Sequence, residues 1–319
     1  MSTQISGQIT QVYTKIKGNI GKVIVGKSET LDMLLVSLLC GGHVLLEDVP
    51  GTGKTVLIKS LAASVSCQYK RIQFTPDLMP SDVLGTTVFN MKTNEFDFHK
   101  GPIFADIVLV DEINRAPAKT QSALFEVMEE RQISIDGTTH RMGELYTILA
   151  TQNPVEQEGT YKLPEAQLDR FLMKITMDYP SLEEEVNILE RHHTNASLIK
   201  LDDIKPAITK EELLSLRALM NQVFVDRTLL QYIALIVQQT RTSKAVYLGA
   251  SPRASVAMLQ SSKAYALLQG RDFVTPEDIK FVAPYVLQHR LILTAEAEME
   301  GYSPVKVTQR LIDKVEVPK

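Results

Sequence analysis

The feature that most constrains the fold is a glycine loop at residues 51–55. The run Gly51-Thr52-Gly53-Lys54-Thr55 follows a short apolar segment, residues 43–46, and precedes a stretch with helical spacing of apolar residues. Two glycines let the backbone turn its N–H groups toward one point, where the dipole of the following helix also favours negative charge. This arrangement predicts a phosphate-binding loop between a buried strand and a helix, and therefore an α/β fold.

The residues of this loop have separate predicted roles. Lys54 supplies a point charge to the β- and γ-phosphates of a nucleotide, and the Thr55 hydroxyl completes the coordination of Mg²⁺. Asp48 stands where the general pattern has glycine, so we expect its carboxylate to point away from the phosphates. The alternative is a chance match in an ordinary turn, which the flanking strand and helix disfavour. The predicted nucleotide-binding stretch is Pro50, Gly51, Thr52, Gly53, Lys54, Thr55 and Val56.

A second element lies about sixty residues downstream. The apolar run at residues 107–110 predicts a central strand and ends in Asp111-Glu112. Open α/β sheets bind their ligands at the carboxyl ends of their strands. Asp111 is thus the candidate carboxylate for Mg²⁺, and Glu112 the candidate base that polarises the attacking water. Such a pair alone is more often a solvated strand end, and the glycine loop gives it its significance.

A third element follows another apolar strand, at residues 145–151. The sequence there continues Gln152-Asn153-Pro154, and an amide beside the γ-phosphate can orient a water. Asn153 is the candidate for this role. Without the other two elements, an ordinary Asn-Pro turn would be the preferred interpretation.

Composition narrows the class of protein. Of the 319 residues, 44% are hydrophobic and 23% are charged, which is the balance of a globular protein with a core of its own. A net charge of −4, without a basic run, argues against a dedicated nucleic-acid binder. The polar N-terminus lacks a signal-peptide pattern, and no apolar run is long enough to span a membrane. With only two cysteines, these features predict a cytoplasmic protein.

The pattern along the chain predicts two domains. Up to about residue 180, helical segments alternate with short apolar runs, which indicates a parallel sheet with helices on both faces, in a first domain at residues 1–195. Two segments inside this part, residues 89–98 and 132–141, have the turn signals of projecting β-hairpins. After Pro180 the pattern is all-helical, with capping boxes at Ser181 and Thr209. Residues 194–209 look like a linker, and a smaller helical domain is predicted at residues 200–319.

Taken together, these motifs resemble the MoxR family of AAA+ ATPases. The resemblance rests on six stretches and covers nearly the whole chain. They are Val23–Gly26, Pro50–Thr55, Asp111–Arg131 (DEINRAPAKTQSALFEVMEER), Ala150–Pro154 (ATQNP), Leu163–Phe171 (LPEAQLDRF) and Gly249–Ala254 (GASPRA). It implies an AAA+ P-loop core at residues 1–195 followed by a smaller helical lid at 200–319. The hairpins match the two inserts of this clade.

The resemblance also implies roles for individual residues. Val25 and Gly26 lie near the adenine, and Asn153 is the sensor 1 residue. Arg170 is the arginine finger that reaches the ATP of a neighbouring subunit, and Arg253 is the sensor 2 arginine on the lid. From the residues alone, Arg170 could equally form a surface ion pair with its neighbour Asp169, and Arg253 could be a surface residue at a helix start.

The leading hypothesis is a ring-forming ATPase, a hexamer by resemblance, that uses ATP and Mg²⁺ to remodel or activate partner proteins. The resemblance implies partners with von Willebrand factor A domains and a role in metal or cofactor insertion. One alternative is a nucleic-acid motor, for which the hairpins offer only Lys92, His140 and Arg141 as basic residues. Another is a small-molecule kinase, which would leave the hairpins, the lid and Arg170 without a role.

Overall fold

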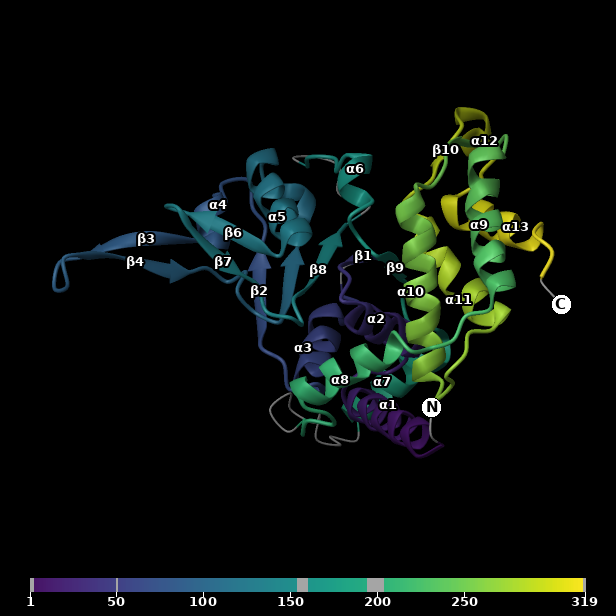
Figure 1. The fold of residues 1–319 in the computed structure, drawn as a ribbon, viewed down its shortest axis with the longest axis horizontal. Helices are drawn as coiled ribbons and strands as arrows, with labels where there is room; N and C mark the ends of the chain where they lie inside the picture. The colour runs from purple at the N-terminus through teal and green to yellow at the C-terminus, as the bar shows by residue number, and fades with distance from the viewer. Residues whose placement is uncertain (1–2, 50, 154–159, 194–203, 318–319) are drawn as a thin grey trace.

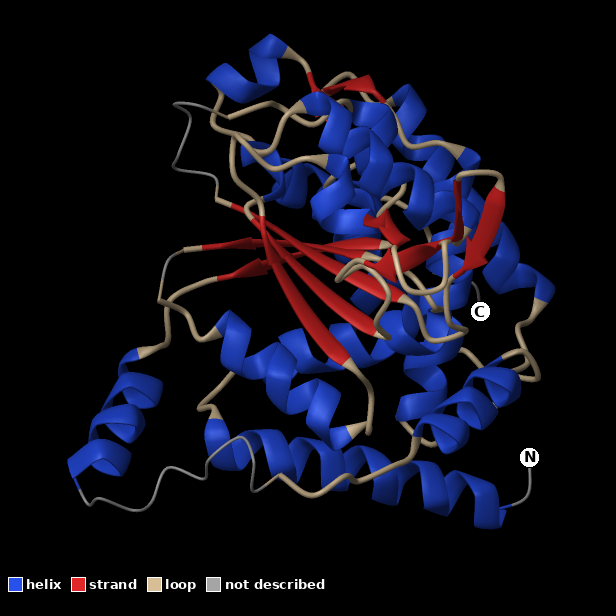
Figure 2. Cartoon of the chain, turned by 90° about the vertical axis from the view of Figure 1, so that its left-hand side faces the viewer, coloured by secondary structure: helices blue, strands red, loops and turns tan. Residues whose placement is uncertain are grey.

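The computed structural model describes residues 3–49, 51–153, 160–193 and 204–317, and its centre is a five-stranded parallel sheet (Figures 1 and 2). Every neighbouring pair of strands is parallel, as the sequence predicts for strands alternating with helices. In spatial order the strands are β2 (Tyr69–Gln73), β5 (Ile107–Asp111), β8 (Thr147–Gln152), β1 (Val44–Asp48) and β9 (Met173–Met177).

Helices cover both faces of this sheet. Side chains of its strands point alternately to the two faces, and each face forms a hydrophobic core with its helices. In β1, Val44 and Leu46 belong to one buried cluster, while Leu45 between them belongs to the other. The first cluster includes residues of α1 (Thr3–Val23), α2 (Ser28–Cys40) and α3 (Lys54–Ser64). The second lies under α4 (Pro80–Leu84), the short helix η1 (Ile113–Arg115) and α5 (Ala118–Glu130). The predicted α/β core with a parallel sheet is therefore confirmed.

Both predicted hairpins are present. The first, β3 (Gly85–Asn90) and β4 (Glu95–Lys100), is longer than the predicted segment and projects far from the body of the molecule (Figure 1). The second comprises β6 (Gln132–Ile135) and β7 (Thr138–Arg141). The rings of Phe98 and His140, 4.3 Å apart, join the two hairpins at their bases. At the outer end of the first hairpin, the aromatic pair Phe89 and Phe96 is exposed.

The C-terminal part is helical, as predicted, with one addition. Its elements are α7 (Leu182–His193), α8 (Lys210–Met220), α9 (Arg227–Thr242), α10 (Pro252–Leu268), α11 (Pro276–Leu287), α12 (Ala295–Met299) and α13 (Pro304–Asp313). The addition to the expected all-helical lid is a short antiparallel ladder of β10 (Val246–Leu248) and β11 (Ile292–Leu293). The capping boxes at Ser181 and Thr209 both form. The predicted boundary near residues 195–200 lies outside the described residues, so the division into domains stays a prediction.

Two elements of the core were not predicted from the sequence. Helix α1 has a polar composition, and among its side chains that the structure describes only Ile9, Ile16 and Ile20 are buried. Strand β2 is an edge strand with the sequence YKRIQ, in which Ile72 alone is buried. Neither segment has the continuous apolar run that marks the buried strands, so neither stands out in the sequence.

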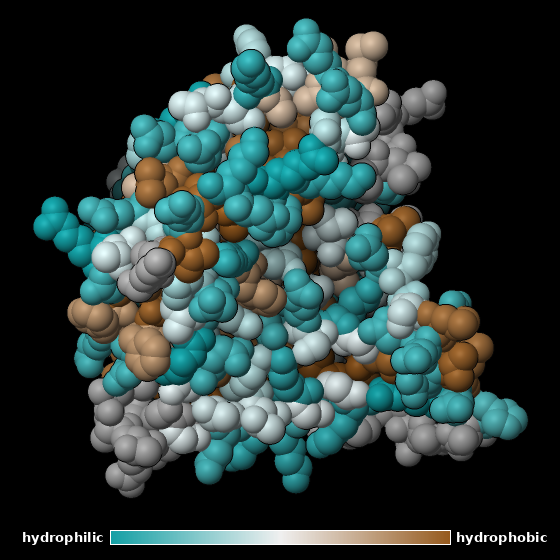
Figure 3. Space-filling view, turned by 90° about the vertical axis from the view of Figure 1, so that its right-hand side faces the viewer, coloured by the Kyte–Doolittle hydropathy of each residue, from teal (hydrophilic) through white to brown (hydrophobic). Residues whose placement is uncertain are grey.

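Hydrophobic side chains also reach the surface of the lid. Figure 3 views the molecule from the lid side, where hydrophobic residues are exposed among polar residues in several separate places. The exposed large hydrophobic residues of this part of the chain are Phe224, Leu230, Leu235, Tyr247, Leu248, Val256, Phe273, Met299, Val305 and Val317. Within the described residues, no helix combines the length and apolar character needed to cross a membrane.

Candidate active site

The glycine loop has the backbone conformation that a phosphate-binding loop requires. Gly51 and Gly53 have φ angles of +88° and +82°, a region that side-chain-bearing residues rarely adopt. Helix α3 begins directly afterwards, at Lys54, so its N-terminal N–H groups point toward the loop. Pro50 and the side chain of Asp48 lie outside what the structure describes, so the expectation that Asp48 points away from the phosphates stays a prediction.

A hollow of about 210 Å³ adjoins the loop. Five of the predicted nucleotide-binding residues line it: Val25, Gly51, Thr52, Gly53 and Val56. Its outer wall is α7, through Ile188, Arg191 and His192. The sequence gives no sign that α7 lies beside the nucleotide, because these residues form no motif. Only the folding of the chain brings them next to the loop.

The other predicted adenine-binding residue, Gly26, explains how α7 approaches so closely. Its φ angle is +71°, and a Cβ atom at this position would overlap the Glu184 carboxylate. Glu184 belongs to the capping box at the start of α7. A residue larger than glycine would therefore have to move the Glu184 carboxylate, which helps to cap α7.

Asp111 lies at the carboxyl end of β5, between two cations. Lys54 Nζ is 3.5 Å from Asp111 Oδ1, and Arg71 Nε donates to Asp111 Oδ2 at 2.5 Å. The Thr151 hydroxyl donates to Asp111 Oδ1 at 3.3 Å. The carboxylate itself is buried, with 3% of its side chain exposed. Hydrogen bonding to Asp111 raises the pKa of the Arg71 guanidinium further above its ordinary value.

Glu112 has a strained backbone and a fixed carboxylate. Its φ of +57° is left-handed, a conformation that costs a non-glycine residue energy and is common at functional sites. Its N–H donates to Thr151 Oγ1 at 2.9 Å, which ties β5 to β8. Gln73 Nε2 donates to Glu112 Oε2 at 2.8 Å, and Arg115 lies 3.2 Å from the same oxygen.

Arg71 and Gln73 are the site residues that sequence reasoning missed. Both come from β2, the edge strand, and they face Asp111 and Glu112 because β2 pairs in register with β5. Alternate residues of a strand point to one side, so the spacing of Arg71 and Gln73 matches a shared contact. That signal becomes visible only once β2 is known to neighbour β5.

These residues fit a bound nucleotide and its Mg²⁺. The buried Asp111 carboxylate and the Thr55 hydroxyl, in the residue directly after Lys54, are oxygen donors of the kind that Mg²⁺ prefers. Lys54 already lies beside this carboxylate and next to the loop. When bound, the metal would neutralise charge on the β- and γ-phosphates. Asn153 follows directly after β8 at the same edge of the sheet, and the Asn-Pro bond after it leads out of the described residues.

The two predicted arginines lie elsewhere and lie together. Arg170 Nη1 is 2.7 Å from Glu129 Oε2, and it donates to the Phe125 carbonyl at 2.6 Å. Arg253 Nη2 donates to Glu129 Oε1 at 2.8 Å. One carboxylate near the end of α5 therefore binds both guanidinium groups. The ion pair between Arg170 and its neighbour Asp169, which the sequence also allowed, is not among the contacts of the described residues, and Asp169 pairs with Arg290 instead.

This arginine pair lies where the strands of the sheet begin, which we call the amino edge. The glycine loop lies where the strands end, which we call the carboxyl edge. Arg170 precedes β9, where Leu172 N donates to the carbonyl of His43, just before β1 begins. The glycine loop follows the other end of β1. A five-residue strand rises about 3.3 Å per residue, so the two edges are roughly 15 Å apart. Neither arginine lines the hollow beside the loop.

Comparison with known proteins agrees with the geometry of this site. Residues 43–173 match the family model described as "ATPase family associated with various cellular activities (AAA)", and residues 238–313 match an AAA lid domain. The chain is 43% identical over 324 residues to "Chaperone MoxR1" of Mycobacterium tuberculosis, covering 98% of this chain and 85% of that protein. This chain belongs to the MoxR family of AAA+ ATPases.

Two further relatives support the assignment. "Uncharacterized protein YeaC" of Bacillus subtilis is 48% identical over 303 residues, covering 94% of this chain and 93% of the relative. The crystal structure of a presumed ATPase from Cytophaga hutchinsonii superposes with a TM-score of 0.91 at 40% identity, covering 99% of this chain and 98% of the other. The predicted MoxR family, its AAA+ fold and its helical lid are thus confirmed.

Proposed function

We propose that this MoxR family chain is an ATP-hydrolysing motor whose active sites are completed between neighbouring copies in a ring, with six as the expected number. One observation carries the proposal. Lys54, Asp111 and Glu112 lie at the carboxyl edge of the sheet, while Arg170 and Arg253 lie together at the amino edge. An arginine side chain cannot cross that distance within one subunit. Two copies packed head to tail bring one edge against the other.

In this mechanism each chain supplies two different sets of groups. At its own nucleotide, Lys54 and the N–H groups of the loop bind the phosphates, and Thr55 with Asp111 holds Mg²⁺. Glu112, held by Gln73, accepts a proton from the attacking water, and Asn153 orients that water. To its neighbour the chain offers Arg170 and Arg253, which stabilise charge on the γ-phosphate during transfer.

We further propose that the motor acts on partner proteins, in the chaperone-like way that the name of the Mycobacterium relative suggests. The first hairpin supports a protein partner better than a nucleic acid. Its outer end exposes Phe89, Met91 and Phe96, and Lys92 is accompanied by Glu95 and Asp97. Partners with von Willebrand factor A domains, and metal or cofactor insertion as the outcome, follow from the family resemblance and belong to this proposal.

Mixing two inactive variants tests the shared active site. Arg170→Ala keeps its own cleft but offers no finger to its neighbour, while Glu112→Gln has the opposite defect. Each alone should bind ATP and release little phosphate. A mixture should recover activity, because a subunit with intact Glu112 can receive Arg170 from a Glu112→Gln neighbour. Recovery should also depend on protein concentration. No recovery at any ratio, despite demonstrated co-assembly, would contradict a finger supplied in trans.

A second experiment addresses the partner. Glu112→Gln rings should hold ATP without hydrolysing it and so retain a bound client. We expect a purified protein with a von Willebrand factor A domain to co-elute with these rings in ATP and to separate from them in ADP. DNA-stimulated phosphate release, with no such protein complex, would instead support a nucleic-acid motor.

A further inference from the structure

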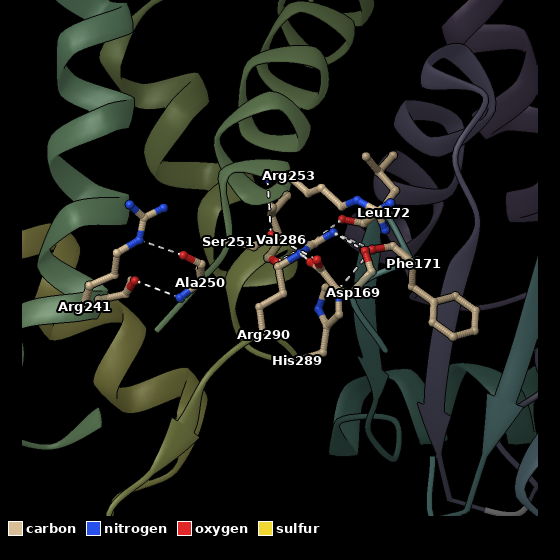
Figure 4. A network of polar contacts seen from close by, with 11 residues as sticks. Asp169, Phe171, Leu172, Arg241, Ala250, Ser251, Arg253, Val286, His289 and Arg290 are labelled. Atoms are coloured by element: carbon tan, nitrogen blue, oxygen red, sulfur yellow. Dashed lines mark hydrogen bonds and ion pairs between the residues drawn. The ribbon is translucent and has the colours of Figure 1, made fainter. Parts of the chain in front are cut away.

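The most heavily bonded side chain between core and lid is that of Arg290, which follows α11 (Figure 4). Its Nε donates to Asp169 Oδ1 at 2.7 Å, and Nη2 donates to the carbonyls of Phe171 at 2.6 Å and Asp169 at 3.3 Å. Nη1 donates to the carbonyl of Leu172 at 3.1 Å and also to that of Val286. Only 3% of the Arg290 side chain is exposed.

A guanidinium buried this deeply is tolerated only because all its nitrogens have partners. Removing the charge from water is costly unless hydrogen bonds and an opposite charge compensate for it. Apart from the Val286 carbonyl, every partner of Arg290 belongs to the segment from Asp169 to Leu172. The lid cannot move away from this segment without leaving the charge unpaired. Arg290 therefore holds core and lid in one fixed relation here.

The bonds lie on both sides of Arg170. Asp169 is bound through its carboxylate and its carbonyl, and the carbonyls of Phe171 and Leu172 are bound as well. The neighbouring His289 adds a contact from Nε2 to the Phe171 carbonyl at 3.1 Å. The backbone at Arg170 is thus fixed from both directions, while its side chain extends to Glu129 at the surface.

The same clamp includes Arg253. The Ser251 hydroxyl donates to Asp169 Oδ2 at 2.9 Å, the carboxylate oxygen that Arg290 leaves free. Ser251 is also the N-cap of α10, two residues before Arg253, and accepts the backbone N–H of Arg253 at 3.2 Å. One carboxylate, that of Asp169, therefore connects Arg290 to the backbone beneath both guanidinium groups.

We infer that Arg290 is a positioning residue: its bonds to Asp169, Phe171 and Leu172 make the lid, Arg170 and Arg253 one rigid unit that is presented to the neighbouring subunit. This inference rests on the proposed function, in which both arginines act in trans. It assigns the lid a task beyond covering a nucleotide. Loss of these bonds would let the arginines move, and so would change hydrolysis in the neighbour rather than in the lid's own subunit.

Arg290→Lys tests the inference, because lysine keeps the charge and loses the fork that binds several carbonyls at once. A displacement of about 1 Å can reduce a rate by ~10²-fold, so we expect kcat to fall by about that factor. The affinity for ATP should stay within about twofold of wild type, since no bond of Arg290 reaches the nucleotide hollow.

The mixture that recovers activity shows whether Arg290 positions the arginines offered to the neighbour or supports the structure of its own subunit. Arg290→Lys mixed with Glu112→Gln should recover activity, because the second chain supplies a correctly held Arg170. Arg290→Lys mixed with Arg170→Ala should not, because neither chain offers a well-placed finger. If Arg290 instead supported its own chain's cleft, the second mixture would recover and the first would not, and the inference would be wrong.

Two controls complete the experiment. Arg271→Lys weakens a comparable pair, Arg271 Nη2 to Asp278 Oδ1 at 2.5 Å, which lies wholly within the lid. It should lower stability with little change in kcat. Asp169→Asn provides a second route to the same defect if Arg290→Lys fails to fold, and should show the same direction of rescue. Recovery in neither mixture would overturn the inference. If Arg170→Ala and Glu112→Gln also fail to rescue each other, the proposed function fails with it.

Discussion

The two edges of the sheet each combine one carboxylate with two cations, and they differ in burial. At the carboxyl edge, Asp111 meets Lys54 and Arg71 with only 3% of its side chain exposed. At the amino edge, Glu129 meets Arg170 and Arg253 with 36% of its side chain exposed. A buried carboxylate is costly to leave without any partner, whereas pairs between exposed groups contribute about 0–1 kcal/mol and exchange partners readily.

The difference indicates how one chain can serve two active sites. The carboxylate at the carboxyl edge is fixed in the sheet, which suits a group that must wait in place for a metal ion. The arginines at the amino edge are held lightly at their tips, by Glu129, and firmly at their backbone, by Asp169 and Arg290. In the proposed mechanism they exchange Glu129 for the phosphate of another subunit, without any change in the fold beneath them.

The largest expected effect is at the carboxyl edge, in Lys54→Ala. Losing a charge-assisted contact of about 1.5–3 kcal/mol should weaken ATP binding by ~10–150-fold. Titration with a fluorescent ATP analogue measures this directly. Lys59→Ala, on the exposed side of the same helix, is the matched control and should bind normally. Equal affinity in Lys54→Ala and wild type would remove the carboxyl edge from the nucleotide site.

At the amino edge, the buried His43 should make the stability of the fold sensitive to acid. His43 accepts the N–H of Ile148 through Nδ1 at 2.9 Å, and its Nε2 lies 3.1 Å from the Met128 carbonyl, so it is held as the neutral ring. Burial lowers the pKa of His43 to about 4, with a smaller contribution from the charge of Arg131. Between pH 6.5 and 4 the unfolded chain therefore binds more protons, and stability falls as the pH falls, by up to ~3 kcal/mol from this residue.

Denaturant unfolding at several pH values checks the size and sign of this effect. A His43→Gln variant, although less stable at pH 7, should lose much less stability between pH 6.5 and 4 than wild type. Burial also lowers the pKa of His289, beside Arg290, which adds to the slope that remains in the variant. Parallel pH profiles for wild type and His43→Gln would show that His43 is not the source.

The sequence was sufficient for the carboxyl edge because its chemistry is local. Gly51–Thr55 and Asp111-Glu112 are runs of adjacent residues, and parallel strands bring their carboxyl ends together in any α/β sheet. Arg71 was missed for the opposite reason: it depends on which strand neighbours β5. The order of strands in a sheet is decided by packing between segments far apart in the sequence.

At the amino edge, the family resemblance singled out Arg170 and Arg253 as candidates, and the sequence could not indicate what holds them. Glu129 lies in a helical run of acidic residues that looks like a solvated surface. Arg290 follows α11 without any motif, and its partner Asp169 is 121 positions away. Contacts across such distances leave no pattern in a single sequence, and only the packing of lid on core reveals them.

A smaller effect is expected for Arg253→Ala, and it tests whether the two arginines act as a pair. Arg170 still has Glu129 and the Phe125 carbonyl when Arg253 is removed, so the finger remains in place. We expect turnover to fall by ~10-fold, less than the ~10³–10⁵-fold that loss of a finger can cause. Arg227→Ala, an exposed arginine at the start of α9, is the control. A loss as large as that of Arg170→Ala would mean that the pair cannot be divided.

The smallest expected effect concerns Arg71, which occupies one oxygen of Asp111 that Mg²⁺ would otherwise approach. Because 49% of the Arg71 side chain is exposed, the pair is worth at most about 1 kcal/mol, or roughly fivefold in affinity. Arg71→Gln should therefore lower the Mg²⁺ concentration needed for half-maximal hydrolysis by up to that factor. The difference from wild type should shrink in high salt, since exposed charges are screened.

Lys70→Gln removes an equal charge from the neighbouring position and should leave the Mg²⁺ requirement unchanged. A higher Mg²⁺ requirement in Arg71→Gln would instead show that Arg71 supports the metal site by orienting Asp111. Arg71 would then stay bound to Asp111 when Mg²⁺ binds.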